Sequence, residues 1–105
     1  MKTSRLSIAP ADAAPGRVLV VDDHREARES MAEVLRQSGH EVRSAASGAE
    51  ALGLLQREAF DCVVTDLKMP GMTGLELIER IEQRRWPAQV VMVTAHATVA
   101  SAVEA

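Results

Sequence analysis

Four short runs typical of strands, three of them apolar and largely β-branched, alternate with segments of helical periodicity, and no other feature constrains the fold of this chain as strongly. The runs lie at 18–21, 41–45, 61–65 and 89–93. The first and third are almost continuously apolar, which is typical of strands covered on both faces of a parallel sheet. Because strands that alternate with helices favour a parallel sheet with helices on both sides, we predict a doubly wound α/β domain.

The segment after the first run carries apolar residues at helical spacing. Ala27, Met31, Val34 and Leu35 recur at three- and four-residue intervals, so we expect them to form the face that packs on the sheet. Gly39 stands where a helix commonly ends in a left-handed residue. The sequence therefore predicts one helix between the first two strands.

Two capping-box signatures mark the starts of two further helices. Ser47 with Glu50, and Thr73 with Glu76, have the spacing at which each side chain bonds a backbone N–H group of the other residue. Each pair precedes a segment with helical periodicity. The apolar stripe of the later helix is predicted to consist of Leu75, Ile78 and Ile81.

The length of 105 residues suffices for one domain with a single core. We expect residues 1–16, rich in Ala, Pro and Ser, to form a flexible leader and residues 17–105 to form the domain.

A net charge of -3 gives no electrostatic reason to expect nucleic acid as a direct partner of this segment. No stretch has the length of a membrane span or a signal-peptide core, so we expect a cytoplasmic protein. The single cysteine, Cys62, is expected to be a small buried apolar residue.

Carboxylates follow two of the predicted strands, at the point where each strand ends. Asp22 and Asp23 come directly after 18–21, and Asp66 comes directly after 61–65. Because the carboxyl ends of parallel strands share one edge of a sheet, these acids would converge if the two strands are neighbours, about 4.8 Å apart. Three like charges so close repel one another unless a cation lies between them. An oxygen-only ligand set favours a hard ion, so the sequence predicts an Mg²⁺ site.

An ordinary structural role is also open for the residues near these strand ends. Aspartate after a strand often caps a helix or forms a turn, and each of the three acids could serve only in that way. Gly71 is a turn-forming residue, and Gly74 is expected to relieve crowding at the start of a helix. The histidines His24, His40 and His96 show no metal-ligand spacing, so we interpret them as solvated loop or cap residues.

Three short motifs, in this order, resemble those of the receiver domain of two-component response regulators. They are DD at 22–23, DLKMPGMTG at 66–74 and TA at 94–95, and the resemblance covers residues 17–105. It implies a flavodoxin-like, three-layer α/β/α fold with strand order 2-1-3-4. The family's fifth strand, which carries a lysine that contacts the phosphoryl group, and its last helix are missing from the sequence. We therefore expect the chain as given to be unstable or to self-associate, because its fourth strand would be an exposed edge.

The resemblance assigns roles to individual residues. Asp66 would be the phosphoacceptor, taking a phosphoryl group from a histidine kinase, and would also bind Mg²⁺. Asp23 would be a direct Mg²⁺ ligand, Asp22 would act largely through water, and the backbone carbonyl of Lys68 would complete the protein ligands. These roles agree with the acid cluster expected from the strand ends, because Mg²⁺ offsets the repulsion between a carboxylate and an incoming phosphate.

The remaining assignments concern signal output. Thr94 would be the switch hydroxyl that hydrogen-bonds the phosphoryl group, and the small side chain of Ala95 would leave room for that group. Residues 98–105 are predicted to begin another helix, and the segment VTAHATVASAVEA, 93–105, is similar to that helix in regulators whose receivers are followed by an ATPase or helix-turn-helix DNA-binding module. The resemblance thus implies a sensor histidine kinase as partner, a transcriptional output domain and a phosphorylation-dependent homodimer.

Two other functions stay open on sequence grounds. A metal-dependent phosphotransferase or phosphatase would use Asp66 as a covalent nucleophile, although the chain contains no insertion of the kind that selects a substrate. A phosphorylation-independent interaction module is the other alternative, and the intact set of acids argues against it. We therefore expect a signalling phosphoacceptor that catalyses only its own phosphorylation and dephosphorylation, and not an enzyme with a separate substrate.

Overall fold

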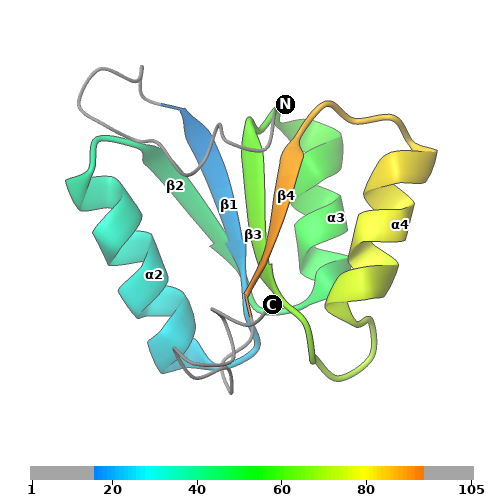
Figure 1. Ribbon diagram of the computed structural model, residues 1–105, viewed down its shortest axis with the longest axis horizontal. Coiled ribbons are helices and arrows are strands. Elements are labelled where there is room, and N and C mark those ends of the chain that lie inside the picture. The colour runs from blue at the N-terminus through cyan, green and yellow to red at the C-terminus, as the bar shows by residue number, and fades with distance from the viewer. Residues whose placement is uncertain (1–15, 94–105) are drawn as a thin grey trace, which may run out of the picture.

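Strands and helices alternate along residues 16–93, which are the residues that the computed structural model describes (Figure 1). In chain order the elements are β1 (Arg17–Val21), α2 (Arg25–Gln37), β2 (Glu41–Ala45), α3 (Gly48–Arg57), β3 (Cys62–Asp66), α4 (Gly74–Gln83) and β4 (Gln89–Val93). None of these helices is long and apolar enough to cross a membrane. Positions 1–15 of the predicted leader, and the predicted helix from position 98, lie outside the described residues.

The four-stranded sheet is parallel throughout, in the order β2-β1-β3-β4 that the family resemblance predicts. The prediction of a doubly wound parallel sheet is confirmed. Val21, at the end of β1, lies opposite Ala45 of β2 and Thr65 of β3. The carboxyl ends of the strands and the first turns of α2 and α4 therefore meet at one edge of the sheet, at the bottom of Figure 1.

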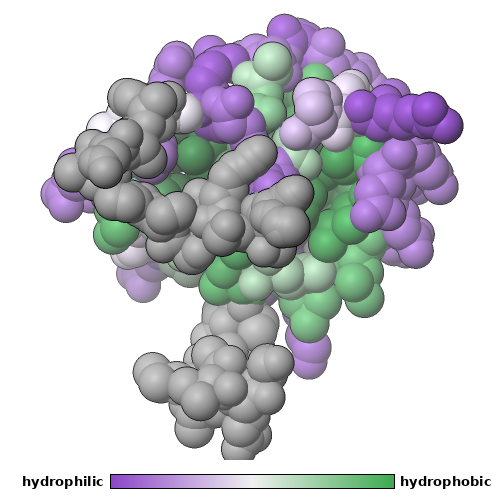
Figure 2. All heavy atoms as spheres, turned by 45° about the horizontal axis from the view of Figure 1, so that its top comes forward, coloured by the Kyte–Doolittle hydropathy of each residue, from purple (hydrophilic) through white to green (hydrophobic). Residues whose placement is uncertain are grey.

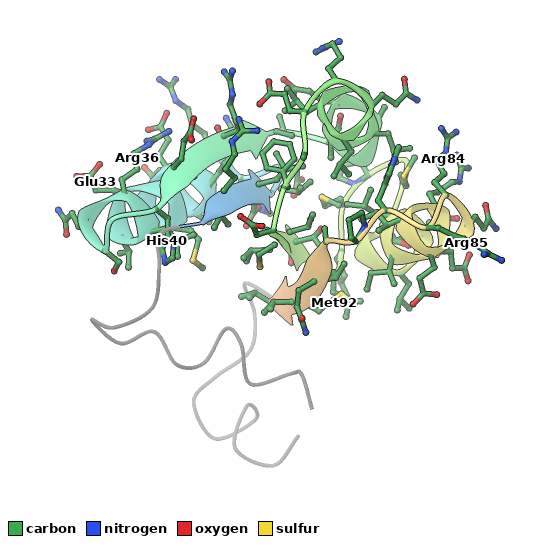
Figure 3. All side chains as sticks on the ribbon, turned by 90° about the horizontal axis from the view of Figure 1, so that it is seen from above. Glu33, Arg36, His40, Arg84, Arg85 and Met92 are labelled. Atoms are coloured by element: carbon green, nitrogen blue, oxygen red, sulfur yellow. The ribbon has the colours of Figure 1, made fainter. Side chains whose placement is uncertain are left out.

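Two apolar layers pack on the two faces of the sheet, because successive side chains of a strand point to opposite faces. The layer on the α2 side consists of Val18, Val20, Ala32, Val42 and Cys62. The larger layer on the side of α3 and α4 includes Leu19, Val21, Ala51, Val63, Leu77 and Ile81. Figure 3, a view from above, shows the three layers with α2 and α4 on opposite sides of the strands. Burial of the single cysteine in the first layer agrees with its predicted role.

The capping residues predicted for α3 and α4 are found at the helix starts, with one difference between the two pairs. At α4 the capping box is complete, because Thr73 Oγ1 accepts a hydrogen bond from Glu76 N and Thr73 N donates to Glu76 Oε1. At α3, Ser47 Oγ accepts from Glu50 N over 3.1 Å. The Glu50 carboxylate, however, accepts from Ala46 N over 2.8 Å and not from the cap residue itself. The second half of that predicted box is therefore shifted by one residue.

Two residues predicted to lie on buried helix faces are exposed. Val34 of α2 is 58% exposed, and Leu75 of α4 is 57% exposed. On α4 the buried face uses Leu77 in place of Leu75, together with the predicted Ile81. On α2 it uses Ala32, and the predicted Met31 and Leu35 are partly buried beside it. Each exposed residue is two positions from a buried one, and residues two apart on a helix point away from each other. The predicted stripes were therefore wrong at these two positions.

The strand β4 is less covered than the two strands at the centre of the sheet. Its residues Gln89–Met92 are half-buried and Val93 is 38% exposed, whereas all four residues of Val18–Val21 are buried. Figure 2 shows hydrophobic atoms reaching the surface between the hydrophilic surfaces of the helices. Within the described residues β4 pairs only with β3, so it forms one edge of the sheet.

An ion-pair network ties the strands together at the edge opposite the strand carboxyl ends. Arg17 Nη2 lies 2.6 Å from Glu58 Oε1, and Arg43 Nη2 lies 3.1 Å from Glu58 Oε2. The backbone N–H of Arg17 also donates to Asp61 Oδ2 over 2.8 Å, and its guanidinium lies 5.0 Å from the centroid of the Phe60 ring. The hydrogen bond from Arg17 holds the pKa of Glu58 below its usual value. The network thus joins β1, β2 and the end of α3.

Replacement of Glu58 by glutamine (Glu58→Gln) should lower the melting temperature at neutral pH. Because the folded state lowers the pKa of Glu58, the ion pair stabilises the fold above the unfolded pKa of about 4.3. That stabilisation is lost as the pH falls through the folded pKa. The difference in melting temperature between wild type and variant, followed by circular dichroism, should therefore shrink on acidification. The matched control Glu79→Gln removes an exposed carboxylate of α4, and a Glu58→Gln difference that stays constant with pH would contradict the assignment.

Candidate functional site

Three carboxylates converge where β1 and β3 end. Val21 and Thr65 are paired in the sheet, so the next residues, Asp22 directly after β1 and Asp66 at the end of β3, lie side by side. Asp66, expected directly after its strand, is itself the last residue of β3 and pairs with Val93 of β4. One carboxylate oxygen of each of these acids, one of Asp23 and a ring nitrogen of His24 all lie within 4.8 Å of one another. The convergence expected from parallel strand ends is therefore present in the structure.

Two of the acids at this edge have carboxylate oxygens without a hydrogen-bond donor among the described residues. Asp66 is 5% exposed, and no residue within 16–93 donates a hydrogen bond to its carboxylate. Thr65 Oγ1 donates instead to the backbone oxygen of Asp66, over 3.0 Å. The Oδ1 atom of Asp23 is buried and accepts no hydrogen bond from a described residue. Burial of anionic oxygens without donors is costly, and a positively charged group at this site would offset that cost.

Asp22 serves as a turn former, as its structural interpretation expects, and its role toward Mg²⁺ stays a prediction. Its Oδ1 accepts a hydrogen bond from the backbone N–H of His24 over 2.9 Å, as in an Asx turn. Its backbone oxygen accepts from Arg28 Nη1 over 2.9 Å, and its N–H donates to Ala45 over 3.1 Å. The backbone at the end of β1 is thereby fixed from both sides, which holds the carboxylate at the sheet edge.

His24 stands at the N-cap of α2 and is 58% exposed in its side chain, as expected for a solvated cap residue. Its imidazole, however, makes no capping hydrogen bond. Instead Nδ1 lies 3.4 Å from Asp22 Oδ1 and 3.3 Å from Asp23 Oδ1. Sequence reasoning missed this contact, and the available signal was only that a histidine follows two adjacent acids at a strand end.

The loop after Asp66 is shaped by close packing against α4. A Cβ atom on Gly74 would fall inside the contact distance of the Asp66 carbonyl oxygen and 3.1 Å from Cα of Leu67. Gly74 N donates to the Leu67 oxygen over 2.9 Å, so the two segments touch through their backbones. Gly71 has φ +82°, the left-handed conformation that glycine adopts readily. The expected roles of both glycines, in a turn and against crowding, are confirmed.

The other predicted site residues are less defined by the structure. The side chain of Lys68 is exposed, and the predicted contribution of its backbone carbonyl to a cation site stays a prediction. Thr94 and Ala95 lie outside the described residues. A cavity of about 20 Å³ between the strand ends is lined by Asp22 and Asp66, among others, and has room for about one water molecule.

Residues 18–105 match the family model of the response regulator receiver domain. The chain belongs to this family. Among curated proteins, the response regulator FleR of Pseudomonas aeruginosa is 42% identical over 89 residues, which are 85% of this chain and 19% of FleR. The transcriptional regulatory protein FixJ of Bradyrhizobium diazoefficiens is 34% identical over 90 residues, 86% of this chain and 44% of FixJ. The receiver domain thus spans less than half the length of these relatives.

Solved receiver structures share the fold. The chemotaxis protein CheY4 of Vibrio cholerae matches with a TM-score of 0.75 at 32% identity, over 87% of this chain and 78% of that one. The response regulator TrrA of Thermotoga maritima, in complex with Mg²⁺-BeF, matches with a TM-score of 0.72 at 38% identity, over 76% and 70%. TrrA in complex with the histidine kinase ThkA matches with a TM-score of 0.72 at 36% identity, over 79% and 72%. The flavodoxin-like receiver fold is therefore shown for this chain.

Substitution of Gly74 by alanine should destabilise the receiver domain by about 1–3 kcal/mol, because the added methyl group overpacks the contact with the Asp66 backbone. The matched control is Gly53→Ala in α3, where an added Cβ meets nothing within 4 Å. That control should be stabilising by roughly 0.5–1 kcal/mol, since alanine favours a helix over glycine. Urea unfolding curves measure both changes, and equal midpoints for the two variants would contradict the close packing.

Proposed function

We propose that this receiver domain accepts a phosphoryl group from a histidine kinase on Asp66 and uses Mg²⁺ to do so. The observation that carries the proposal is the buried Asp66 carboxylate, which has no donor within residues 16–93 and lies within 4.8 Å of two further acids. A nucleophile for phosphoryl transfer must be held still while its charge is offset. Sheet pairing holds the Asp66 carboxylate in place, and a bound cation would offset its charge.

The donor set fits Mg²⁺. Asp22, Asp23 and Asp66 offer carboxylate oxygens at one edge, and the Lys68 carbonyl would complete the set. The buried Oδ1 of Asp23, without a hydrogen-bond donor among the described residues, is the kind of atom that a cation satisfies. When bound, Mg²⁺ neutralises negative charge shared by the acceptor and the incoming phosphate. The Mg²⁺-BeF complex of the similar protein TrrA supports this choice of ion.

In the proposed transfer, an oxygen of the Asp66 carboxylate attacks the phosphorus of phosphohistidine. The new O–P bond forms an acyl phosphate while the N–P bond breaks, and its electron pair stays on the imidazole nitrogen, which takes up a proton. A carboxylate nucleophile requires no general base, so the residues of the domain have only to orient it and balance charge. The tight turn held by Asp22 and the backbone contact at Gly74 provide that orientation.

The proposed output of phosphorylation rests on membership of the receiver family. Thr94 would bond the new phosphoryl group, and Ala95 would leave space for it, so that phosphorylation biases one of two arrangements of this edge. The partner would be a sensor histidine kinase, as ThkA is for TrrA in their complex. A transcriptional output domain, named for the relative FixJ, and a phosphorylation-dependent homodimer would carry the signal onward in the cytoplasm. The domain would act as a signalling phosphoacceptor and not as an enzyme with its own substrate.

Incubation with acetyl phosphate and Mg²⁺ should attach one phosphoryl group per chain, and Asp66→Asn should abolish it because the amide is not a nucleophile. Intact-mass spectrometry measures the stoichiometry directly. The matched control is Asp61→Asn, which changes a carboxylate at the opposite end of the sheet while keeping an oxygen that can accept from Arg17 N. This control should be labelled like the wild type.

Two results would count against the phosphoacceptor. Labelling that survives Asp66→Asn would place the reaction at another residue. Many rapid turnovers of small phosphate esters, lost in Asp66→Asn, would favour a metal-dependent phosphatase instead, since a receiver releases its single phosphoryl group slowly.

The cation site makes a separate prediction for Asp23. Without Mg²⁺, Asp23→Asn should raise the melting temperature, because it removes one of three crowded negative charges. Saturating Mg²⁺, at roughly 100 times its dissociation constant, should stabilise the wild type by about 2.7 kcal/mol and the variant much less. Thermal melts with and without Mg²⁺ measure both effects, with Asp61→Asn as control. An Mg²⁺-dependent rise of equal size in Asp23→Asn would exclude this residue as a ligand.

A further inference from the structure

The imidazole of His24 lies against the acid cluster without forming the hydrogen bonds that would explain its place. Its Nδ1 atom is 3.4 Å from Asp22 Oδ1 and 3.3 Å from Asp23 Oδ1, beyond the usual 2.7–3.2 Å of an N–H···O hydrogen bond. Nδ1 also makes no capping bond to α2, although His24 is the N-cap residue. The nitrogen therefore faces two carboxylates at once and is bonded to neither.

These distances are close to those between neighbouring donor atoms around a small divalent ion. Ligands of such ions lie about 2.0–2.2 Å from the metal, which puts adjacent donors roughly 2.8–3.1 Å apart in octahedral sites and roughly 3.3–3.6 Å apart in tetrahedral sites. The contacts of Nδ1 with both carboxylate oxygens fall in the tetrahedral range, the geometry that Zn²⁺ favours. Asp66, buried and without a donor among the described residues, closes the group from β3.

The backbone of His24 is fixed, so its side chain is presented to the site by the fold. Its N–H donates to Asp22 Oδ1 over 2.9 Å, and its carbonyl oxygen accepts from Arg28 N over 2.9 Å as the first bond of α2. Only the side-chain torsions of His24 remain to bring Nδ1 to an ion. A ligand held in this way loses little conformational freedom on binding.

We propose that His24 is a nitrogen ligand of the cation site, which therefore binds borderline divalent ions such as Zn²⁺ more tightly than Mg²⁺. The inference rests on the proposed cation site of Asp22, Asp23 and Asp66 and adds a fourth side chain to it. Imidazole suits Zn²⁺ and other transition ions, whereas Mg²⁺ keeps oxygen ligands and water. With Mg²⁺ the imidazole stays outside the coordination sphere, and with Zn²⁺ its Nδ1 enters it.

The test is a titration of the chain with Zn²⁺ alone and with Mg²⁺ alone, followed by calorimetry and by ¹⁵N spectra of the imidazole nitrogens. His24→Ala should weaken Zn²⁺ binding by at least roughly ten- to a hundredfold, because loss of a ligand should cost no less than loss of a group that only supports one. Its Mg²⁺ affinity should change by less than about threefold, because Mg²⁺ does not use the nitrogen. Zn²⁺, but not Mg²⁺, should shift one imidazole ¹⁵N resonance that is missing from His24→Ala. The control His40→Gln, at the other end of the sheet, should keep the Zn²⁺ affinity of the wild type.

The outcomes separate this inference from the proposed cation site. If Asp23→Asn weakens Mg²⁺ binding but His24→Ala leaves Zn²⁺ binding unchanged, the site stands and the role of His24 is refuted. If His24→Ala strengthens the binding of both ions by the same factor, His24 is an internal counter-ion and not a ligand. If Asp23→Asn changes the binding of neither ion, the cation site and this inference fail together.

Discussion

The parallel pairing of β1 with β3 is the constraint on which the rest of the structure depends. Val21 lies opposite Thr65, so Asp22 and Asp66 reach the sheet edge as neighbours. Backbone hydrogen bonds and two apolar layers thus hold together negative charges that would separate in water. The network of Arg17 with Glu58 stabilises the opposite edge, where the carboxylate of Glu58 has cationic partners. One sheet therefore combines a stable end with an electrostatically strained one.

Much of this architecture could be predicted from local sequence patterns, namely strand periodicity, helix capping and glycine placement. The strands at 41–45 and 89–93 have the bounds expected from the sequence, and the capping box of Thr73 with Glu76 starts α4 as its spacing indicates. Gly39, at φ +97°, ends α2 in the left-handed conformation expected there. The convergence of the three acids could also be predicted from the strand ends, because topology alone fixes the edge at which parallel strands finish.

The sequence-based predictions differ from the structure where tertiary packing decides which of two apolar helix faces is buried. Val34 and Leu75 are apolar at helical spacing, yet the sheet packs on the neighbouring face of each helix. The approach of His24 to the acids depends on the turn formed by Asp22, and no spacing rule encodes a single histidine beside a turn. Thr94 and Ala95 lie outside the described residues, so their roles stay predictions that rest on family membership.

The alternation of side chains along β1 limits how the length of this domain can vary. Val18 and Val20 belong to one apolar layer, and Leu19 belongs to the other. Gain or loss of one residue within the strand would send every later side chain to the wrong layer and carry Asp22 out of step with Asp66. The number of residues in β1 therefore sets both the packing of the two apolar layers and the position of Asp22. Insertions are tolerable only in the connections away from the acidic edge.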